Sequence, residues 1–182
     1  MKSLKKALIY FTTLILITSC IQDLDFDQIN DFSLTPVFEG SLIGFSFTPR
    51  QFFDASGTLQ TERTDTTDFL IFENDFIRKN LIRIEFNVEI INTIDNDFSI
   101  QIDFLDQNNN STHTFKEIIV NGNDDDFKFT ETIDISPDSE IKNTSQLRIT
   151  ARVTSSNPPL DPSDINELLF KSSAKLFIRT NG

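Results

Sequence analysis

Residues 81–92, with the sequence LIRIEFNVEIIN, decide the fold class of this chain. Apolar residues occupy every second position from Ile82 to Ile90, and the positions between them hold charged or polar residues. A period of two places all the apolar side chains on one face of an extended strand, whereas a helical stripe would repeat every 3.6 residues. The stretch therefore predicts a β-strand with one buried face and one face in water.

The same alternation recurs along the rest of the chain. It predicts further strands at residues 98–104, 127–135, 147–153 and 174–178, a less regular one at 115–120, and upstream candidates at 41–48 and 68–72. Short polar segments at 95–96, 106–111 and 121–124 separate consecutive runs, as hairpin turns do. We therefore expect one all-β domain over residues 32–182, an antiparallel β-sandwich, Ig-like or similar, of seven to nine strands. An up-and-down β-barrel shows the same alternation and is the alternative.

One short helix is expected between the last two strands. Asp161 is suited to an N-cap position and Pro162 to the first turn, with Asn166–Phe170 following.

Composition excludes several classes of protein. The 182 residues include 16 basic and 28 acidic ones, for a net charge of −12, which argues against nucleic acid as a partner. A single Cys excludes an internal disulfide framework, and a single His excludes paired-His metal motifs. The 19 Phe fall mostly on the apolar faces of expected strands and are interpreted as core, with a Phe-lined cavity for a hydrophobic ligand as the alternative.

The first twenty residues form a targeting segment. Lys2, Lys5 and Lys6 precede an apolar run over residues 7–17. This run is shorter than the roughly 20 residues that a membrane span requires, so a signal peptide over residues 1–19 is the better interpretation. The run ends in Ile17-Thr18-Ser19-Cys20, which resembles the lipobox of bacterial lipoproteins. The resemblance implies cleavage between Ser19 and Cys20 and lipidation of Cys20 with acyl chains such as palmitate.

The residues after Cys20 bear on localisation. Ile21, rather than Asp, follows the lipidated Cys, and by analogy with lipoprotein sorting this favours the outer membrane. Residues 20–31 hold the lipidated Cys and an acidic tether with Asp23, Asp25 and Asp27 at alternate positions, which also resembles a short surface-export signal. Whether the protein faces the periplasm or the cell surface is left open. Removal of three lysines with the signal would change the net charge to −15, from 13 basic and 28 acidic residues.

Calcium is the most specific cofactor suggested by the sequence, and otherwise no cofactor is expected. Asp106, Asn108, Asn110 and Glu117 match the oxygen-ligand spacing of an EF-hand loop, although Ser111 stands where that loop needs Gly. The flanks read as strands, so a polar hairpin is the competing interpretation. The acidic turn at 123–126 is a second candidate.

Other constellations are weaker. His113, at the start of an expected strand, is interpreted as a solvated or hydrogen-bonded surface group, since no nucleophile elbow accompanies it. Five basic residues on the polar faces of expected strands could form one basic stripe, or pair across strands with Glu85, Glu89 or Asp134: Arg83, Arg148, Arg152, Lys175 and Arg179.

These observations predict a membrane-anchored envelope lipoprotein, a non-enzymatic accessory or interaction module. Its expected partners are the membrane, through Cys20, and an unidentified envelope protein or surface ligand. The alternatives are a carrier of a hydrophobic ligand and a hydrolase that works through carboxylates.

Overall fold

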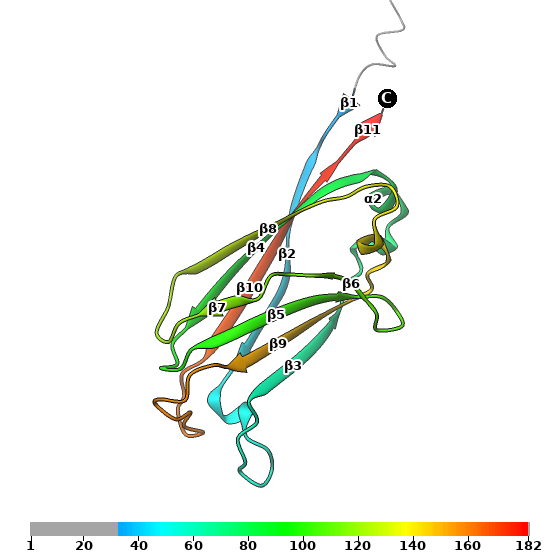
Figure 1. Ribbon diagram of the computed structural model, residues 1–182. Helices are drawn as coiled ribbons and strands as arrows, with labels where there is room; N and C mark the ends of the chain where they lie inside the picture. Colours follow the sequence, from blue (N-terminus) through cyan, green and yellow to red (C-terminus); the bar gives the residue numbers. More distant parts are fainter. Residues whose placement is uncertain (1–32, 182) are drawn as a thin grey trace, which may run out of the picture. The chain divides into compact units, whose positions relative to one another are not determined.

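Two antiparallel sheets make up the body of the protein (Figure 1), whose computed structural model describes residues 33–181. The four-stranded sheet has the order β2 (Val37–Phe47), β10 (Leu168–Ile178), β4 (Leu81–Asn92), β8 (Phe127–Asp134). The other has the order β3 (Glu62–Asp68), β9 (Gln146–Val153), β5 (Phe98–Leu105), β6 (Ser111–Thr114), with β7 (Ile118–Val120) also paired to β5. The short strands β1 (Ser33–Leu34) and β11 (Thr180–Asn181) pair with each other.

The connectivity of the sandwich is that of a jelly roll. If β6 and β7 are counted as one interrupted strand, the eight strands follow the order 1-8-3-6 in one sheet and 2-7-4-5 in the other. This double Greek key differs from the connectivity of an Ig-like sandwich. The predicted all-β antiparallel sandwich is confirmed, and the two separate sheets are not closed into the alternative barrel.

Two of the three expected hairpins are wrong. Only residues 106–110 join neighbouring strands of one sheet, β5 and β6. The segments 93–97 and 121–126 instead cross from one sheet to the other, because they join β4 to β5 and β7 to β8. One buried side chain joins the two crossovers: Asn92 Nδ2 donates to the carbonyls of Asn96 and Asn121 at 2.9 and 2.8 Å. A short turn can lead to a strand of the same sheet or of the other sheet, so the turn residues alone do not distinguish a hairpin from a crossover.

The predicted helix is also wrong. Asp161 accepts hydrogen bonds from the backbone N–H and the hydroxyl of Ser163 at 2.8 and 2.7 Å, which forms a turn, and the chain is already extended from Leu168 onward. The one α-helix described in residues 33–181 is α2 (Asp75–Asn80). Its N-cap, Asn74, accepts from two backbone N–H groups of the first turn, an arrangement the sequence NDFIRKN could have indicated.

Strand β3 lies where a connection was expected, and the strand expected at 68–72 is replaced by the short 3-10 helix η3 (Ile71–Glu73). All seven residues of β3 are exposed because it is an edge strand, so it carries no apolar alternation. Arg63 and Asp65 lie opposite the buried Ala151 and Ile149 and therefore share their inward side. Inward charges on an edge strand oppose pairing with another chain.

One hydrophobic core lies between the sheets. Its fully buried members include Phe52, Phe98, Phe104 and Phe170. The Phe rings pack on one another rather than around a space: Phe104 lies 5.1 Å from Phe86, 5.2 Å from Phe115 and 5.6 Å from Phe69, centroid to centroid. This packing is that of a core and gives no support to the carrier alternative.

Candidate functional site

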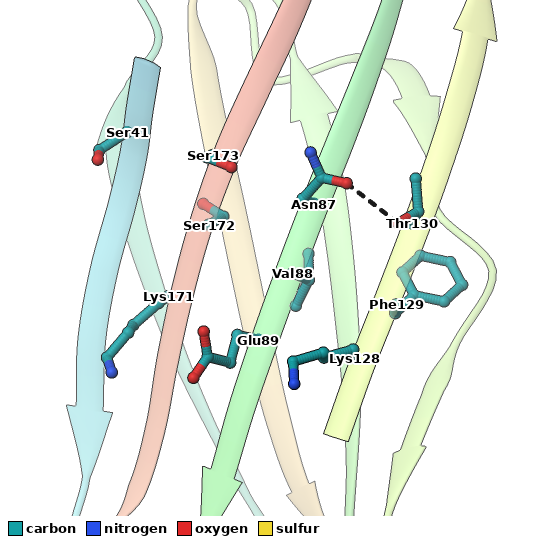
Figure 2. A pocket seen from close by; sticks show the side chains of 10 residues that line it. All are labelled: Ser41, Asn87, Val88, Glu89, Lys128, Phe129, Thr130, Lys171, Ser172 and Ser173. Atoms are coloured by element: carbon teal, nitrogen blue, oxygen red, sulfur yellow. Dashed lines mark hydrogen bonds between the residues drawn. The ribbon is translucent and has the colours of Figure 1, made fainter. Parts of the chain in front are cut away.

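The outer face of the four-stranded sheet carries a polar depression (Figure 2). Ser41, Ser173, Asn87 and Thr130 stand opposite one another on β2, β10, β4 and β8. Directly opposite residues of antiparallel strands point to the same face. The register therefore makes one row of small hydroxyl and amide side chains across the whole sheet.

A second row, of charged side chains, borders the first. Lys171, Glu89 and Lys128 stand opposite one another on β10, β4 and β8. The Lys128 amine contacts the carboxylate of Asp126, and this hydrogen bond, together with the charge of Asp126, raises the pKa of Lys128. Alternating charges across a sheet are favourable, and this row carries a net charge of +1.

The two rows line a depression of about 350 Å³. At its centre the register of β10 and β2 shifts, which marks a β-bulge between Lys171 and Ser173. The Ser172 hydroxyl accepts from Ile43 N–H and donates to Ile43 C=O, both at 3.2 Å, and so replaces the interrupted ladder. Because a bulge bends and twists its strand, this irregularity shapes the face locally.

The depression offers hydrogen-bonding groups to a ligand. Thr130 donates to Asn87 Oδ1 at 3.1 Å, which leaves the Asn87 amide nitrogen on the side away from Thr130 (Figure 2). Within residues 33–181, the hydroxyls of Ser41 and Ser173 and the Lys171 amine have no hydrogen-bond partner. Glu89 is the one carboxylate among the ten residues that line the depression, whereas acid–base hydrolysis of glycosides requires two. The arrangement is suited to binding a polar surface.

The lipidation and cleavage residues predicted from the sequence, Cys20 and Ser19, lie outside the described residues, as do the signal peptide and the acidic tether. None of the helices in the described part of the chain is both long and apolar enough to cross a membrane.

The structure does not bring the four calcium candidates together. The Asp106 carboxylate accepts from the N–H groups of Asn108 and Asn110, both at 2.8 Å, and from Asn110 Nδ2 at 3.0 Å. These bonds lower the pKa of Asp106, the side-chain bond from Asn110 most strongly. Glu117 lies beside the start of β5, roughly 15 Å along that strand from Asp106, because Phe115 N–H bonds to Ile102 C=O. Asp106 thus organises the hairpin that was the competing interpretation.

In the second calcium candidate, residues 123–126, the side chains of Asn123 and Asp126 contact different partners. Asn123 Nδ2 donates to Asp95 Oδ1 at 2.8 Å, and Asp126 contacts Lys128. Among residues 33–181 there is no group of three or more His, Cys, Asp or Glu side chains arranged to hold a metal ion.

His113 differs from the expected surface group. Its ring packs against Phe104 and Phe115, with centroids 5.7 and 5.8 Å away, and its side chain is 28% exposed. Nε2 lies 3.8 Å from Glu131 Oε1 on the facing sheet and has no hydrogen-bond partner in the described part of the chain. Burial lowers the pKa of His113, and Glu131 partly offsets this effect. His113 lies two positions before the buried Phe115, and residues two apart in a strand share a face, so the sequence could have indicated that His113 points inward.

The basic stripe does not form, because its members lie on opposite faces of the sandwich. Arg83 bonds to Asp134 at 2.7 Å on the four-stranded sheet. Arg148 bonds to Asp103 at 2.9 Å on the other sheet. Arg152 likewise pairs with Glu62 at 2.9 Å. Cross-strand pairing, the alternative interpretation, therefore accounts for these three residues, although only Arg83 pairs with an expected partner.

The rows of the depression were not singled out in the sequence. Asn87, Thr130 and Ser173 occupy polar positions of alternating strands, like many others. Only the pairing register reveals that they form one row.

No family model and no curated protein matches this chain. Among solved structures, it is similar to the VP2 subviral particle of infectious bursal disease virus, with 12% identity over 79% of this chain and 32% of that one, TM-score 0.41. It is similar to a protein from Parabacteroides distasonis, with 15% identity over 63% of this chain and 38% of that one, TM-score 0.45. It is also similar to a protein of Bacillus endospore appendages, with 8% identity over 80% of this chain and 91% of that one, TM-score 0.33. The chain spans about a third of the length of the first two structures.

Proposed function

We propose that this protein is a membrane-anchored envelope lipoprotein that acts as a non-enzymatic interaction module. The anchor is Cys20, and the binding face is the polar depression on the four-stranded sheet. The observation that carries the proposal is the row of Ser41, Ser173 and Asn87 beside Lys171 and Glu89, in which the two serine hydroxyls have no hydrogen-bond partner within residues 33–181. The partner is a polar surface of another envelope protein.

Membrane anchoring allows a binding face with few strong contacts to associate with its partner. A protein held at the membrane meets a membrane-bound partner at high effective concentration, so weak hydrogen bonds suffice for association. Each buried methylene of a lipid chain contributes about 0.8 kcal/mol, and stable anchoring takes two or more chains.

Cell fractionation tests the anchor. We expect Cys20→Ser to move the protein from the membrane fraction to the soluble fraction, with loss of labelling by radioactive palmitate. Retention of the variant in the outer membrane would contradict lipid anchoring through Cys20.

Site-specific photocrosslinking in intact cells tests the binding face. We expect a photoreactive residue at Ser173 to give a discrete crosslinked product that Lys171→Glu abolishes. The matched control is the same residue at Thr66, which is exposed on the edge strand of the other sheet. Identical products from both positions would refute the assignment.

A further inference from the structure

The residues at the beginning of β2 and at the end of β10 lie beside helix α2. Ile178 N–H bonds to Pro36 C=O at 3.1 Å, and Arg179 N–H bonds to Asn80 C=O at 2.9 Å. The beginning of β2, the end of β10 and the end of α2 therefore meet (Figure 1). We call this end of the sandwich, which also holds the loops 69–80, 106–110 and 135–145, the α2 end.

Exposed apolar side chains gather at the α2 end. Five of the eight large hydrophobic residues that are exposed in the described part of the chain belong to it, and each is between 51% and 58% exposed: Leu34, Val37, Phe38, Leu70 and Phe76. Exposed apolar groups concentrated in one region mark an interaction surface more often than scattered ones do.

A cationic depression lies at the same end. Arg78 and Lys79 of α2 and Lys142 of the 3-10 helix η4 (Glu140–Asn143) line a hollow of about 580 Å³, with Asp138 as the one carboxylate among its lining residues. Arg78 Nη2 lies 2.7 Å from Asp75, and the Lys142 amine donates to Pro137 C=O at 3.3 Å. Lys79 has no ion pair within residues 33–181.

The opposite end is strongly acidic. Its loops 48–61, 93–97, 121–126 and 154–167 hold one basic residue, Arg50, and nine acidic ones, for a net charge of −8. The acidic residues are Asp54, Asp95, Asp97, Asp124, Asp125, Asp126, Asp161, Asp164 and Glu167. The loops of the α2 end together with Arg179 hold five acidic and four basic residues, for a net charge of −1.

This charge asymmetry orients the sandwich near an anionic surface. The 11 residues of β10 separate the two ends by about 36 Å, several times the Debye length of about 8 Å at physiological salt. When the α2 end faces the surface, the acidic end is therefore screened from it. In the reverse orientation nine carboxylates would meet the anionic surface directly.

We infer that the α2 end is a membrane-facing surface whose cationic depression takes the phosphate of an anionic lipid headgroup, while Leu70 and Phe76 enter the interfacial layer. The inference rests on the proposed anchoring at Cys20. Leu34 follows Cys20 by 14 residues, so the tether reaches at most about 50 Å and keeps the sandwich close to the bilayer.

A single tryptophan reports the orientation. The chain contains no Trp, and its one Tyr lies in the signal peptide, so Phe76→Trp introduces a unique fluorophore. The matched control is Ile165→Trp at the acidic end, where the side chain is 93% exposed. Each chain starts at Cys20, contains the whole sandwich, and is coupled through its only thiol to a maleimide phospholipid in vesicles of phosphatidylglycerol with brominated acyl chains.

We expect the brominated chains to quench the Phe76→Trp emission at least about twofold and to leave the Ile165→Trp emission unchanged. We expect less quenching in phosphatidylcholine vesicles with the same brominated chains. Equal quenching of the two reporters, or stronger quenching at position 165, would overturn the orientation. Because the coupling is chemical, this result does not depend on lipidation in cells, which the Cys20→Ser fractionation tests separately.

Charge reversal tests the headgroup contact. Each basic residue near an anionic surface contributes about fivefold to binding. We expect Lys79→Glu in the Phe76→Trp chain to reduce quenching clearly, and Arg78→Glu with Lys142→Glu to remove the remainder. Arg50→Glu, at the opposite end, is the control and should leave quenching unchanged. Full quenching in folded Lys79→Glu protein, with the fold checked by circular dichroism, would refute the role of the depression.

Discussion

Replacement of Phe104 by Ala tests whether the two sheets share one aromatic core. Phe104 on β5 is fully buried and contacts Phe86 on β4, in the facing sheet, at 5.1 Å between ring centroids. Phe-to-Ala changes in well-packed cores cost about 3–5 kcal/mol, through lost burial and the cavity left behind. A domain of this size loses roughly 2–4 °C of Tm per kcal/mol, so we expect Tm to fall by roughly 6–20 °C.

Urea unfolding followed by far-UV circular dichroism measures the effect. The control is Phe76→Ala, because Phe76 is 52% exposed and should cost less than about 1 kcal/mol. A loss below about 1.5 kcal/mol for Phe104→Ala, or one equal to that of the control, would refute the described packing.

Two further predictions concern single positions. Gly122→Ala should destabilise the fold by about 1–3 kcal/mol, because the added Cβ would lie 2.1 Å from the backbone oxygen of Asp95. Gly40→Ala is the control: its Cβ meets nothing within 4 Å, so stability should change by less than about 0.5 kcal/mol. Equal urea midpoints for the two variants would contradict the described crossover. Burial lowers the pKa of His113 below the ordinary histidine value of 6.5, so its contribution to stability is complete above pH 6.5 and is lost as pH falls through the folded-state pKa. His113→Gln should therefore show a smaller fall in unfolding free energy between neutral and mildly acidic pH than the unmodified chain, and parallel pH profiles would show that His113 is not the group responsible.

Alternation could predict the main strands and which of their faces is buried. The pattern from Ile82 to Ile90 matches β4, in which Ile84, Phe86, Val88 and Ile90 are all buried. Strand β3 escaped prediction because an edge strand with exposed residues on both sides leaves no apolar signal. The sequence predicts a helix at Asp161 wrongly because an Asp followed by Pro is suited equally to a helix start and to a turn.

The binding face could not be predicted to the same extent. The sequence shows that Asn87 and Ser173 face water, since they occupy polar positions of alternating strands. It does not show that they lie opposite one another, because β4 and β10 are separated by 75 residues and the register depends on which strands pair.

The sequence by itself determined the strand character of the chain, the inward face of most strands and the resemblance of residues 17–20 to a lipobox, because each depends on neighbouring residues and local periodicity. The tertiary structure alone decided the jelly-roll order, the crossovers at 93–97 and 121–126, and the polar and charged rows of the depression. The physical reason is that strand pairing joins residues far apart in the chain. A period of two specifies which side of a strand is buried and carries no information about the strand beside it.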